Sequence, residues 1–228
     1  MDRTPEDPKA FAARYFDTVS PFYDQVTSDG TGGWTPNSVA ARLLAPYLRP
    51  QIRLLDVGAG TGQTVAALLA VSPAADVTAL DVSEGMLDVL QGRFAGVRTF
   101  HGTLEQFAGQ GRGATFDVIT SVGVLEFVPD IGSFISTAAA LLPAAGVLAF
   151  TYMPAIMFHQ HQDPAAPHGS AGQRSSPGSC CWEPGEIGQL LAGHGFAVAH
   201  DVELVAYREG PEPIINHFVV ARLGISKV

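Results

Sequence analysis

The sequence predicts an α/β fold built on a doubly wound sheet of about seven strands, mostly parallel and closed by an antiparallel C-terminal hairpin. Three observations predict it. A short apolar segment runs into a glycine-rich loop and an amphipathic helix over residues 52–69. Apolar strands then alternate with amphipathic helical segments as far as residue 152, as parallel sheets require. Two further strand-like runs, 196–207 and 214–222, flank a turn at Glu209–Pro213 and indicate a hairpin at the sheet edge.

The glycine loop LLDVGAGTGQT, Leu54–Thr64, carries the strongest functional signal. Its glycines, Gly58, Gly60 and Gly62, permit positive φ and let a ligand approach the backbone closely. The helix that follows begins with free amides, which favour a polar or anionic group. The spacing is GxGxG rather than the GxGxxG that is typical of dinucleotide-binding loops, and Asp56 stands two positions before the first glycine.

The later strands bring further polar residues to strand ends. Strand 76–81 ends in Asp81, 19 residues after Gly62, a spacing that fits one crossover helix. A carboxylate at this strand tip is placed to accept hydrogen bonds from a ribose diol. Ser83 then has the features of a helix N-cap ahead of Met86. The other strands are expected at 97–101, 116–121 and 147–152.

The order and content of these segments, from about Tyr15 to Arg222, resemble the class I methyltransferases that use S-adenosylmethionine (SAM), in particular small-molecule enzymes of the ubiquinone-biosynthesis type. The glycine loop resembles their motif I, D/E-x-G-x-G-x-G. The resemblance implies a Rossmann-like fold, SAM as cofactor and methyl transfer to a small-molecule acceptor. It also implies a set of cofactor-binding residues, namely Tyr23, Asp56, Gly58, Ala59, Gly60, Asp81, Val82, Met86, Thr103, Leu104, Ser121 and Val122.

Within this implied site, Gly58 and Gly60 admit the methionine moiety and Asp56 orients its ammonium group. Asp81 binds the ribose hydroxyls, and Met86 lies against the adenine face. The two residues at the tip of the fourth strand, 121 and 122, stand beside the methionine end.

One position departs from the resembling pattern. After the third strand the family commonly has Gly-Asp, whereas this chain has Gly102-Thr103. The carboxylate that usually accepts from the adenine amino group is therefore missing. Either the Thr103 hydroxyl accepts that hydrogen bond or the Leu104 amide serves the adenine ring.

Residues 1–50 are expected to form an N-terminal helical cap ahead of a cofactor-binding domain at 51–228. Phe11, Tyr15 and Phe16 suggest a first helix, and Thr35 with Pro36 suggests the start of a second. In the resembling family such elements fold over the bound cofactor, and a Phe-Tyr-Asp segment recurs there. Tyr23 therefore either contacts the methionine end of the cofactor or simply packs a helix against the sheet.

A lid insertion is expected at 153–181, which has no clear helical or strand pattern. It contains His159 and His161, and histidine is the natural base near neutral pH for an acceptor hydroxyl or enol. Their spacing also suggests a metal pair, but no further ligand follows at a diagnostic spacing. The alternative to a catalytic role is that both histidines are solvated residues of the lid. Glu126 either faces the pocket or caps the following helix, and we expect a pocket-edge role. The candidate catalytic residues are His159, His161 and Glu126.

Bulk properties narrow the function classes. The 228 residues suit one α/β domain with additions, and the net charge of −9 with only 13 Lys plus Arg argues against a nucleic-acid substrate. The N-terminus has no signal-peptide pattern and no apolar run is long enough to span a bilayer, so we expect a cytoplasmic protein without membrane association. The only cysteines, Cys180 and Cys181, are adjacent, which argues against a disulfide framework and against a cysteine-rich zinc site. A monomer or homodimer is expected.

Two other functions remain open at this stage. Some relatives of this fold use SAM in cyclisations, eliminations or decarboxylations, and production of S-adenosylhomocysteine (SAH) would separate these from methyl transfer. A catalytically silent SAM-binding partner subunit would instead bind the cofactor tightly without turnover. Our expectation is a methyltransferase of secondary metabolism, with the acceptor atom, oxygen, nitrogen or carbon, left open.

Overall fold

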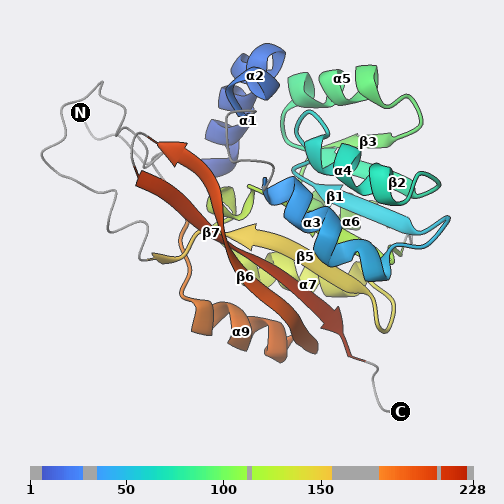
Figure 1. Cartoon of the computed structure of the whole chain (residues 1–228), viewed down its shortest axis with the longest axis vertical. Helices are drawn as coiled ribbons and strands as arrows, with labels where there is room; N and C mark the ends of the chain where they lie inside the picture. The colour runs from blue at the N-terminus through green and yellow to red at the C-terminus, as the bar shows by residue number, and fades with distance from the viewer. Residues whose placement is uncertain (1–6, 28–34, 112–114, 156–179, 210–211, 225–228) are drawn as a thin grey trace, which may run out of the picture.

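The computed structural model describes residues 7–27, 35–111, 115–155, 180–209 and 212–224, which form a seven-stranded sheet flanked by helices (Figure 1). The strand order is β3-β2-β1-β4-β5-β7-β6. The strands β1 to β5 pair in parallel, whereas β7 pairs antiparallel with both β5 and β6. Their bounds are β1 (Arg53–Val57), β2 (Asp76–Asp81), β3 (Arg98–His101), β4 (Val118–Ser121), β5 (Val147–Tyr152), β6 (Phe196–Glu209) and β7 (Glu212–Leu223). The predicted sheet and its C-terminal hairpin are confirmed.

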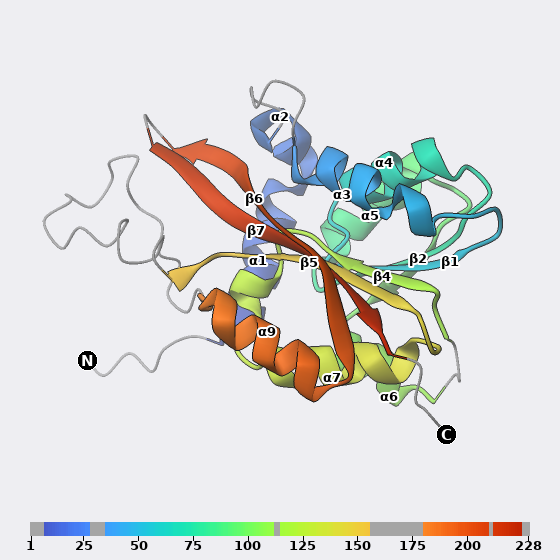
Figure 2. The ribbon, with the colours of Figure 1, turned by 60° about the horizontal axis from the view of Figure 1, so that its bottom comes forward.

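Helices cover both faces of this sheet (Figure 2). One face is covered by α3 (Pro36–Leu44), α4 (Gln63–Val71) and α5 (Glu84–Arg93). The other is covered by α6 (Leu104–Gly109), α7 (Ile131–Leu141) and α9 (Pro184–Gly193). Short 3₁₀ turns are η1 (Ser20–Phe22), η2 (Ala45–Tyr47) and η3 (Leu125–Phe127). The two hydrophobic clusters lie on opposite faces of the sheet and hold the helices to it.

The central strands owe their position to continuous apolar sequence. All six residues of β5 are buried, as are four of the five in β1, which is what a parallel strand covered on both faces requires.

Two helices begin at the polar residues that the sequence indicates as N-caps. Thr35 Oγ1 accepts from the Ser38 amide at 3.2 Å and Ser83 Oγ from the Met86 amide at 3.1 Å. Both predicted N-caps are therefore confirmed.

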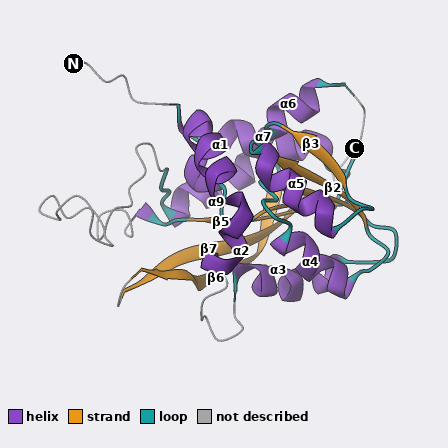
Figure 3. Cartoon of the chain, turned by 90° about the horizontal axis from the view of Figure 1, so that it is seen from above, coloured by secondary structure: helices purple, strands orange, loops and turns teal. Residues whose placement is uncertain are grey.

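The N-terminal helices α1 (Pro8–Val19) and α2 (Tyr23–Thr27) lie over one edge of the α/β core, where Figure 3 shows them from above. In contrast, α3 packs beside α4 on the sheet face and belongs to the core. The described part of residues 1–50 thus contains the expected helices. Its division from the remainder at residue 50 stays a prediction, and of the expected lid at 153–181 residues 156–179 lie outside the described residues.

The C-terminal hairpin is longer than the sequence suggested. Its pairing continues to Glu209 opposite Glu212, so most of the expected turn at 209–213 belongs to the strands. Two register shifts occur in β6, between Val198 and His200 and between Val205 and Tyr207. These local bulges let the 14 residues of β6 pair with the 12 residues of β7. The long hairpin reaches past the end of β5 (Figure 1).

Candidate active site

A cavity lies where β1, β2 and β4 end, between the α/β core and the N-terminal helices. Its empty space is about 830 Å³, part of it open to solvent. Ligands of doubly wound sheets bind at this end of the strands. Nine of the twelve predicted cofactor-binding residues line the cavity: Tyr23, Gly58, Gly60, Asp81, Val82, Met86, Thr103, Leu104 and Val122.

The glycine loop forms one wall of the cavity and uses backbone conformations that favour glycine. Gly58 and Gly60 have φ of +69° and +53°. A Cβ on Gly58 would stand 2.2 Å from Val124 Cγ2, whereas a Cβ on Gly60 would meet nothing within 4 Å. Gly58 therefore allows close packing against the loop after β4, and Gly60 leaves a free surface facing the cavity.

This contrast predicts different consequences for two alanine substitutions. Both Gly58→Ala and Gly60→Ala place a side chain in the left-handed region, but only Gly58→Ala also overpacks Val124. We expect Gly58→Ala to lower the free energy of unfolding by about 1–3 kcal/mol more than Gly60→Ala. Urea unfolding of the two variants side by side measures this difference, and equal midpoints with equal slopes would contradict it.

Asp81 ties the glycine loop to the tip of β2. Its Oδ2 accepts from the Gly60 amide at 2.8 Å and its Oδ1 from the Ser83 amide at 2.9 Å. Burial raises the pKa of Asp81, although these backbone hydrogen bonds oppose the rise. Each carboxylate oxygen has a second acceptor site, so Asp81 can still bind hydroxyl groups in the cavity that it lines.

Asp56 lies beneath the cavity wall and does not line it. Its Oδ1 accepts from the Thr120 hydroxyl at 2.6 Å, but its buried Oδ2 has no hydrogen-bond partner among the described residues. Burial raises the pKa of Asp56 to about 7, and the nearby Asp81 carboxylate adds to this effect. An unpartnered buried carboxylate oxygen favours a cationic or hydrogen-bond-donating group close by.

Thr103, which stands where the resembling family commonly has aspartate, caps a helix in this structure. Thr103 is the N-cap of α6, and its hydroxyl accepts from the Gln106 amide at 3.3 Å. The Gln106 side chain in turn accepts from the Thr103 amide at 2.8 Å, which completes a capping box. The Thr103 hydroxyl, predicted as an acceptor for adenine, thus already accepts one hydrogen bond within the protein. Leu104 opens the helix beside it and also lines the cavity.

Aromatic side chains form the roof of the cavity. Phe16 from α1 makes edge contacts with Tyr23 and with Phe127, at centroid distances of 6.0 and 5.6 Å. Burial raises the pKa of Tyr23 to about 12, and the carboxylates of Asp81 and Glu126 add to the rise. Tyr23 therefore both packs against Phe16 and lines the cavity, so the two roles considered for it are compatible.

Glu126 is buried behind this cavity and is absent from its lining. Its Oε1 accepts from Asn216 Nδ2 of β7 at 3.1 Å, while Oε2 has no partner among the described residues. Burial raises the pKa of Glu126. It does not cap α7, a role that Asp130 fills by accepting from the Ser133 amide at 2.9 Å. The other two predicted catalytic residues, at positions 159 and 161, lie outside the described residues.

Three predicted cofactor-binding residues do not reach the cavity. Besides Asp56, these are Ala59, whose amide donates to the Leu80 carbonyl at 2.9 Å, and Ser121, whose hydroxyl donates to the Val57 carbonyl at 3.1 Å. Both are buried where the loop and strands join. Sequence reasoning missed the apolar lining from other elements, such as Val124, and from α1 and α7. Only the alanines and aromatic residues of the N-terminal helix hinted at it.

No cluster of three or more His, Cys, Asp or Glu side chains that could hold a metal ion occurs among the described residues. Within the same residues, no helix is long and apolar enough to cross a membrane.

Comparison with known proteins gives a consistent result. Residues 55–148 match the family model described as a methyltransferase domain. The reducing polyketide synthase Preu2 of Preussia isomera is 32% identical over 138 residues, which are 57% of this chain and 6% of that protein. The ubiquinone biosynthesis O-methyltransferase of Aromatoleum aromaticum is 34% identical over 103 residues, 43% of each chain. The chain thus spans less than half the length of these curated relatives.

Solved structures share the whole fold. Magnesium protoporphyrin IX methyltransferase from Synechocystis PCC 6803, solved with bound SAM, has a TM-score of 0.68 to this structure at 18% sequence identity. The match covers 97% of this chain and 99% of that one. At this identity the likeness establishes the fold, and the residues of the cavity have to be argued from their own geometry.

Proposed function

Because the chain carries a domain of the class I, SAM-dependent methyltransferase family, we propose that it transfers a methyl group from SAM to a small-molecule acceptor. The observation that carries the proposal is the cavity at the ends of β1, β2 and β4. It joins the open backbone at Gly60, the Asp81 carboxylate and an apolar wall in one place. That combination suits a ligand with a polar chain, a sugar diol and a flat apolar ring.

The residues of the cavity divide among the parts of such a cofactor. Gly58 and Gly60 would hold the methionine chain, and Asp81 would accept from the ribose hydroxyls. Met86 and Leu104, which line the cavity beyond Asp81, would contact the adenine ring. The ammonium group would lie toward the unpartnered oxygen of Asp56, although that residue does not itself line the cavity. When bound, SAM supplies an electrophilic methyl group on a sulfonium.

The chain's own contribution to the reaction is alignment and the exclusion of water. Alignment alone can lower a barrier by about 7–11 kcal/mol. The roof formed by Phe16, Tyr23 and Phe127 covers one side of the cavity and would limit the access of solvent to a bound cofactor. A hydroxyl or enol acceptor must also lose a proton, for which Glu126 and the two histidines at 159 and 161 are our candidate bases.

A small-molecule acceptor is supported by the charge of the chain and by its cavity. With 13 Lys plus Arg and a net charge of −9, the chain has little to neutralise a phosphate backbone. A segment of a polyketide synthase is among its relatives, which supports an acceptor in secondary metabolism. We propose that the protein acts there without nucleic-acid or membrane partners, as a cytoplasmic monomer or homodimer.

The substitution Asp81→Ala tests the cofactor assignment. Wild-type protein is expected to bind one SAH per chain and to be stabilised by it, by about 2.7 kcal/mol at 100 times the dissociation constant. Asp81→Ala removes the ribose acceptor and should weaken SAH binding at least about tenfold, or ~1.4 kcal/mol. Isothermal titration calorimetry measures both affinities.

Two controls make this experiment decisive. Asp88→Ala changes an exposed carboxylate on α5 and should leave SAH affinity unaltered. NAD is the competing ligand for a glycine loop after a strand. Equal SAH affinity of wild type and Asp81→Ala would refute the ribose assignment, and preferential binding of NAD would refute the cofactor itself.

A further inference from the structure

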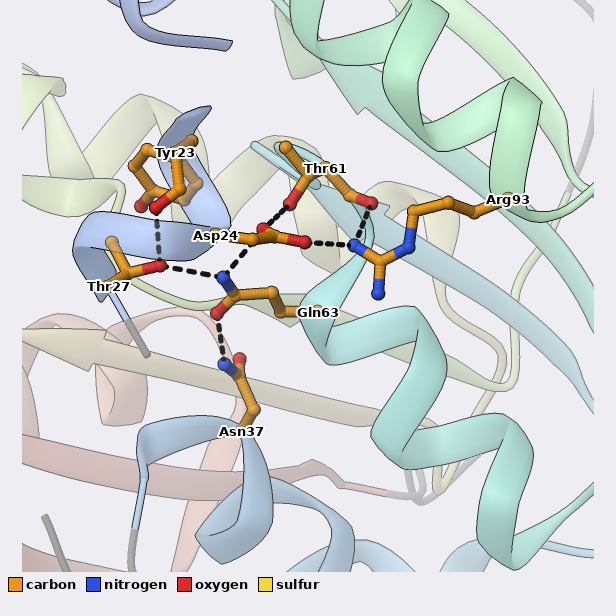
Figure 4. Close-up of polar contacts among 7 residues, drawn as sticks. All are labelled: Tyr23, Asp24, Thr27, Asn37, Thr61, Gln63 and Arg93. Atoms are coloured by element: carbon orange, nitrogen blue, oxygen red, sulfur yellow. Dashed lines mark hydrogen bonds and ion pairs between the residues drawn. The ribbon is translucent and has the colours of Figure 1, made fainter. Parts of the chain in front are cut away.

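The roof of the cavity is attached to the α/β core by two aspartates. Asp17 of α1 accepts from the Ser83 hydroxyl at 2.6 Å and from the Gly85 amide at 3.1 Å. Asp24 of α2 makes the second attachment, to the glycine loop itself (Figure 4). Because Phe16 and Tyr23 stand immediately before these two aspartates, each attachment fixes one aromatic side chain of the roof.

Asp24 is the centre of the second attachment. Its Oδ1 accepts from the Thr61 hydroxyl at 2.5 Å and from Gln63 Nε2 at 2.9 Å. Its Oδ2 forms an ion pair with Arg93 Nη1 of α5 at 2.6 Å. The same Arg93 nitrogen donates to the Thr61 carbonyl at 3.0 Å. One carboxylate therefore joins α2, the glycine loop, the start of α4 and the end of α5, as Figure 4 shows.

Further hydrogen bonds extend this network on either side. Gln63 Nε2 also donates to Thr27 Oγ1 at 2.8 Å, and Gln63 Oε1 accepts from Asn37 Nδ2 of α3 at 3.1 Å. Thr27 Oγ1 donates to the Tyr23 carbonyl at 2.9 Å, so the network also includes the backbone of a roof residue. Desolvation alone would raise the pKa of Asp24, but the bonds from Thr61, Gln63 and Arg93 outweigh it and lower the pKa. Asp24 is thus held as a carboxylate.

The position of this network links it to the cavity. Thr61 lies between Gly60, which lines the cavity, and Gly62, which opens α4. Tyr23, next to Asp24, lines the cavity from the opposite side. An exposed ion pair far from any site would contribute little beyond surface charge. Here the Asp24 carboxylate joins the helix that carries Tyr23 to the loop that carries Gly60, and both of these residues line the cavity.

We propose that Asp24 is a positioning residue that latches the N-terminal roof onto the glycine loop and thereby retains the cofactor in the cavity. The inference rests on the proposed function, since it concerns the same cavity. Retention follows from a population argument. A ligand that requires the closed roof binds with an apparent dissociation constant that rises in proportion as the closed fraction falls. Removing the latch should therefore speed release of the cofactor.

The test uses radiolabelled SAH bound to the full-length protein and chased with excess unlabelled SAH. Asp24→Ala should release SAH about tenfold faster or more, as expected if the ratio of closed to open protein falls about tenfold. Asp24→Asn should be intermediate, because an asparagine oxygen still accepts from Thr61 and Gln63 but carries no charge for Arg93. Arg93→Met should resemble Asp24→Asn, and adding it to Asp24→Ala should have little further effect, since both changes break one network.

Asp76→Asn is the matched control. It breaks the Arg98–Asp76 ion pair, whose 2.7 Å separation and partial exposure are similar to those of the Arg93–Asp24 pair, at the opposite end of β2 from the cavity. Its SAH release should equal that of wild type. The thermal midpoint of each ligand-free Asp24 or Arg93 variant should fall no further than that of Asp76→Asn. A merely structural role for Asp24 would lower this midpoint instead.

Each outcome has a definite meaning. Unchanged release from Asp24→Ala overturns the latch while leaving the proposed function intact. Faster release that is matched by a collapse of the ligand-free midpoint in both Asp24→Asn and Arg93→Met also overturns it, because the network would then only hold the fold together. If wild-type protein fails to bind SAH, the proposed function fails first, and the latch with it.

Discussion

Between about pH 4 and pH 7, the protein is expected to lose stability as the pH rises, and Asp56→Asn should remove the part of this dependence that Asp56 contributes. The cause is the buried Asp56 carboxyl, which has a pKa of about 7 instead of the ordinary 3.8, chiefly because burial disfavours its charge. Within this interval the folded chain keeps a proton on Asp56 that the unfolded chain has released. The free energy of unfolding should therefore fall by about 1.4 kcal/mol per pH unit, or ~4 kcal/mol in all.

The sign follows from the direction of the shift. An acid whose pKa is raised on folding contributes its full stabilisation below the unfolded pKa and loses it as the pH passes through the folded pKa. Asp81 and Glu126 are buried acids with pKa values shifted in the same direction, so the wild-type slope combines several groups. Asp56→Asn isolates one of them, because an asparagine keeps an oxygen for the Thr120 hydroxyl and cannot ionise.

Urea unfolding of wild type, Asp56→Asn and Asp88→Asn over this pH range makes the measurement. Asp88 is an exposed carboxylate on α5, so Asp88→Asn should retain the wild-type slope. If Asp56→Asn also retains it, Asp56 is ionised in the folded state and the argument from burial is wrong. A flattened slope would show that Asp56 carries a proton in the folded protein over this pH range.

Much of the fold was predictable from the sequence because its signals are local. The apolar strands, the glycine loop and the helix caps at Thr35 and Ser83 each depend on a few consecutive residues. The strands β2 and β5 have the predicted bounds. The length of the hairpin was underestimated, because the turn residues between Glu209 and Glu212 resemble a longer loop until pairing across the strands is known.

The site was predictable where the glycine loop and the strand ends fix the position of a residue, and nine of the twelve predicted cofactor-binding residues line the cavity. Gly60 and Asp81 lie where the loop and strand pattern placed them, and they contact each other. Asp56 and Ser121 lie at the same strand ends but face inward, since side chains alternate along a strand and a shift of one residue changes the face. The network around Asp24 joins residues up to 69 positions apart in the sequence, so no local pattern could have revealed it.

Replacement of Glu126 by glutamine is expected to lower turnover by about 10²- to 10⁴-fold, the range for loss of a general base, with SAH affinity unchanged. Glu126 follows β4 in η3, and burial raises the pKa of its carboxyl above the ordinary value, which makes the carboxylate a stronger base. Its Oε2 has no partner among the described residues, while Oε1 is fixed by Asn216. Its charge also raises the pKa of Tyr23, which lines the cavity, so the carboxylate lies electrostatically close to the site.

The measurement requires an acceptor from which wild-type protein forms SAH, and it compares turnover with SAH affinity at several pH values. Wild-type turnover should rise with pH as the Glu126 carboxyl ionises, because only the carboxylate can take the acceptor's proton. Glutamine retains the shape and an oxygen for Asn216 but cannot take that proton, so the rise should vanish in Glu126→Gln. His159→Ala and His161→Ala are assayed in parallel as the rival bases. Full turnover in Glu126→Gln with a loss in either histidine variant would assign the base to that histidine, and full turnover in all three would mean that the acceptor reaches the cavity already deprotonated.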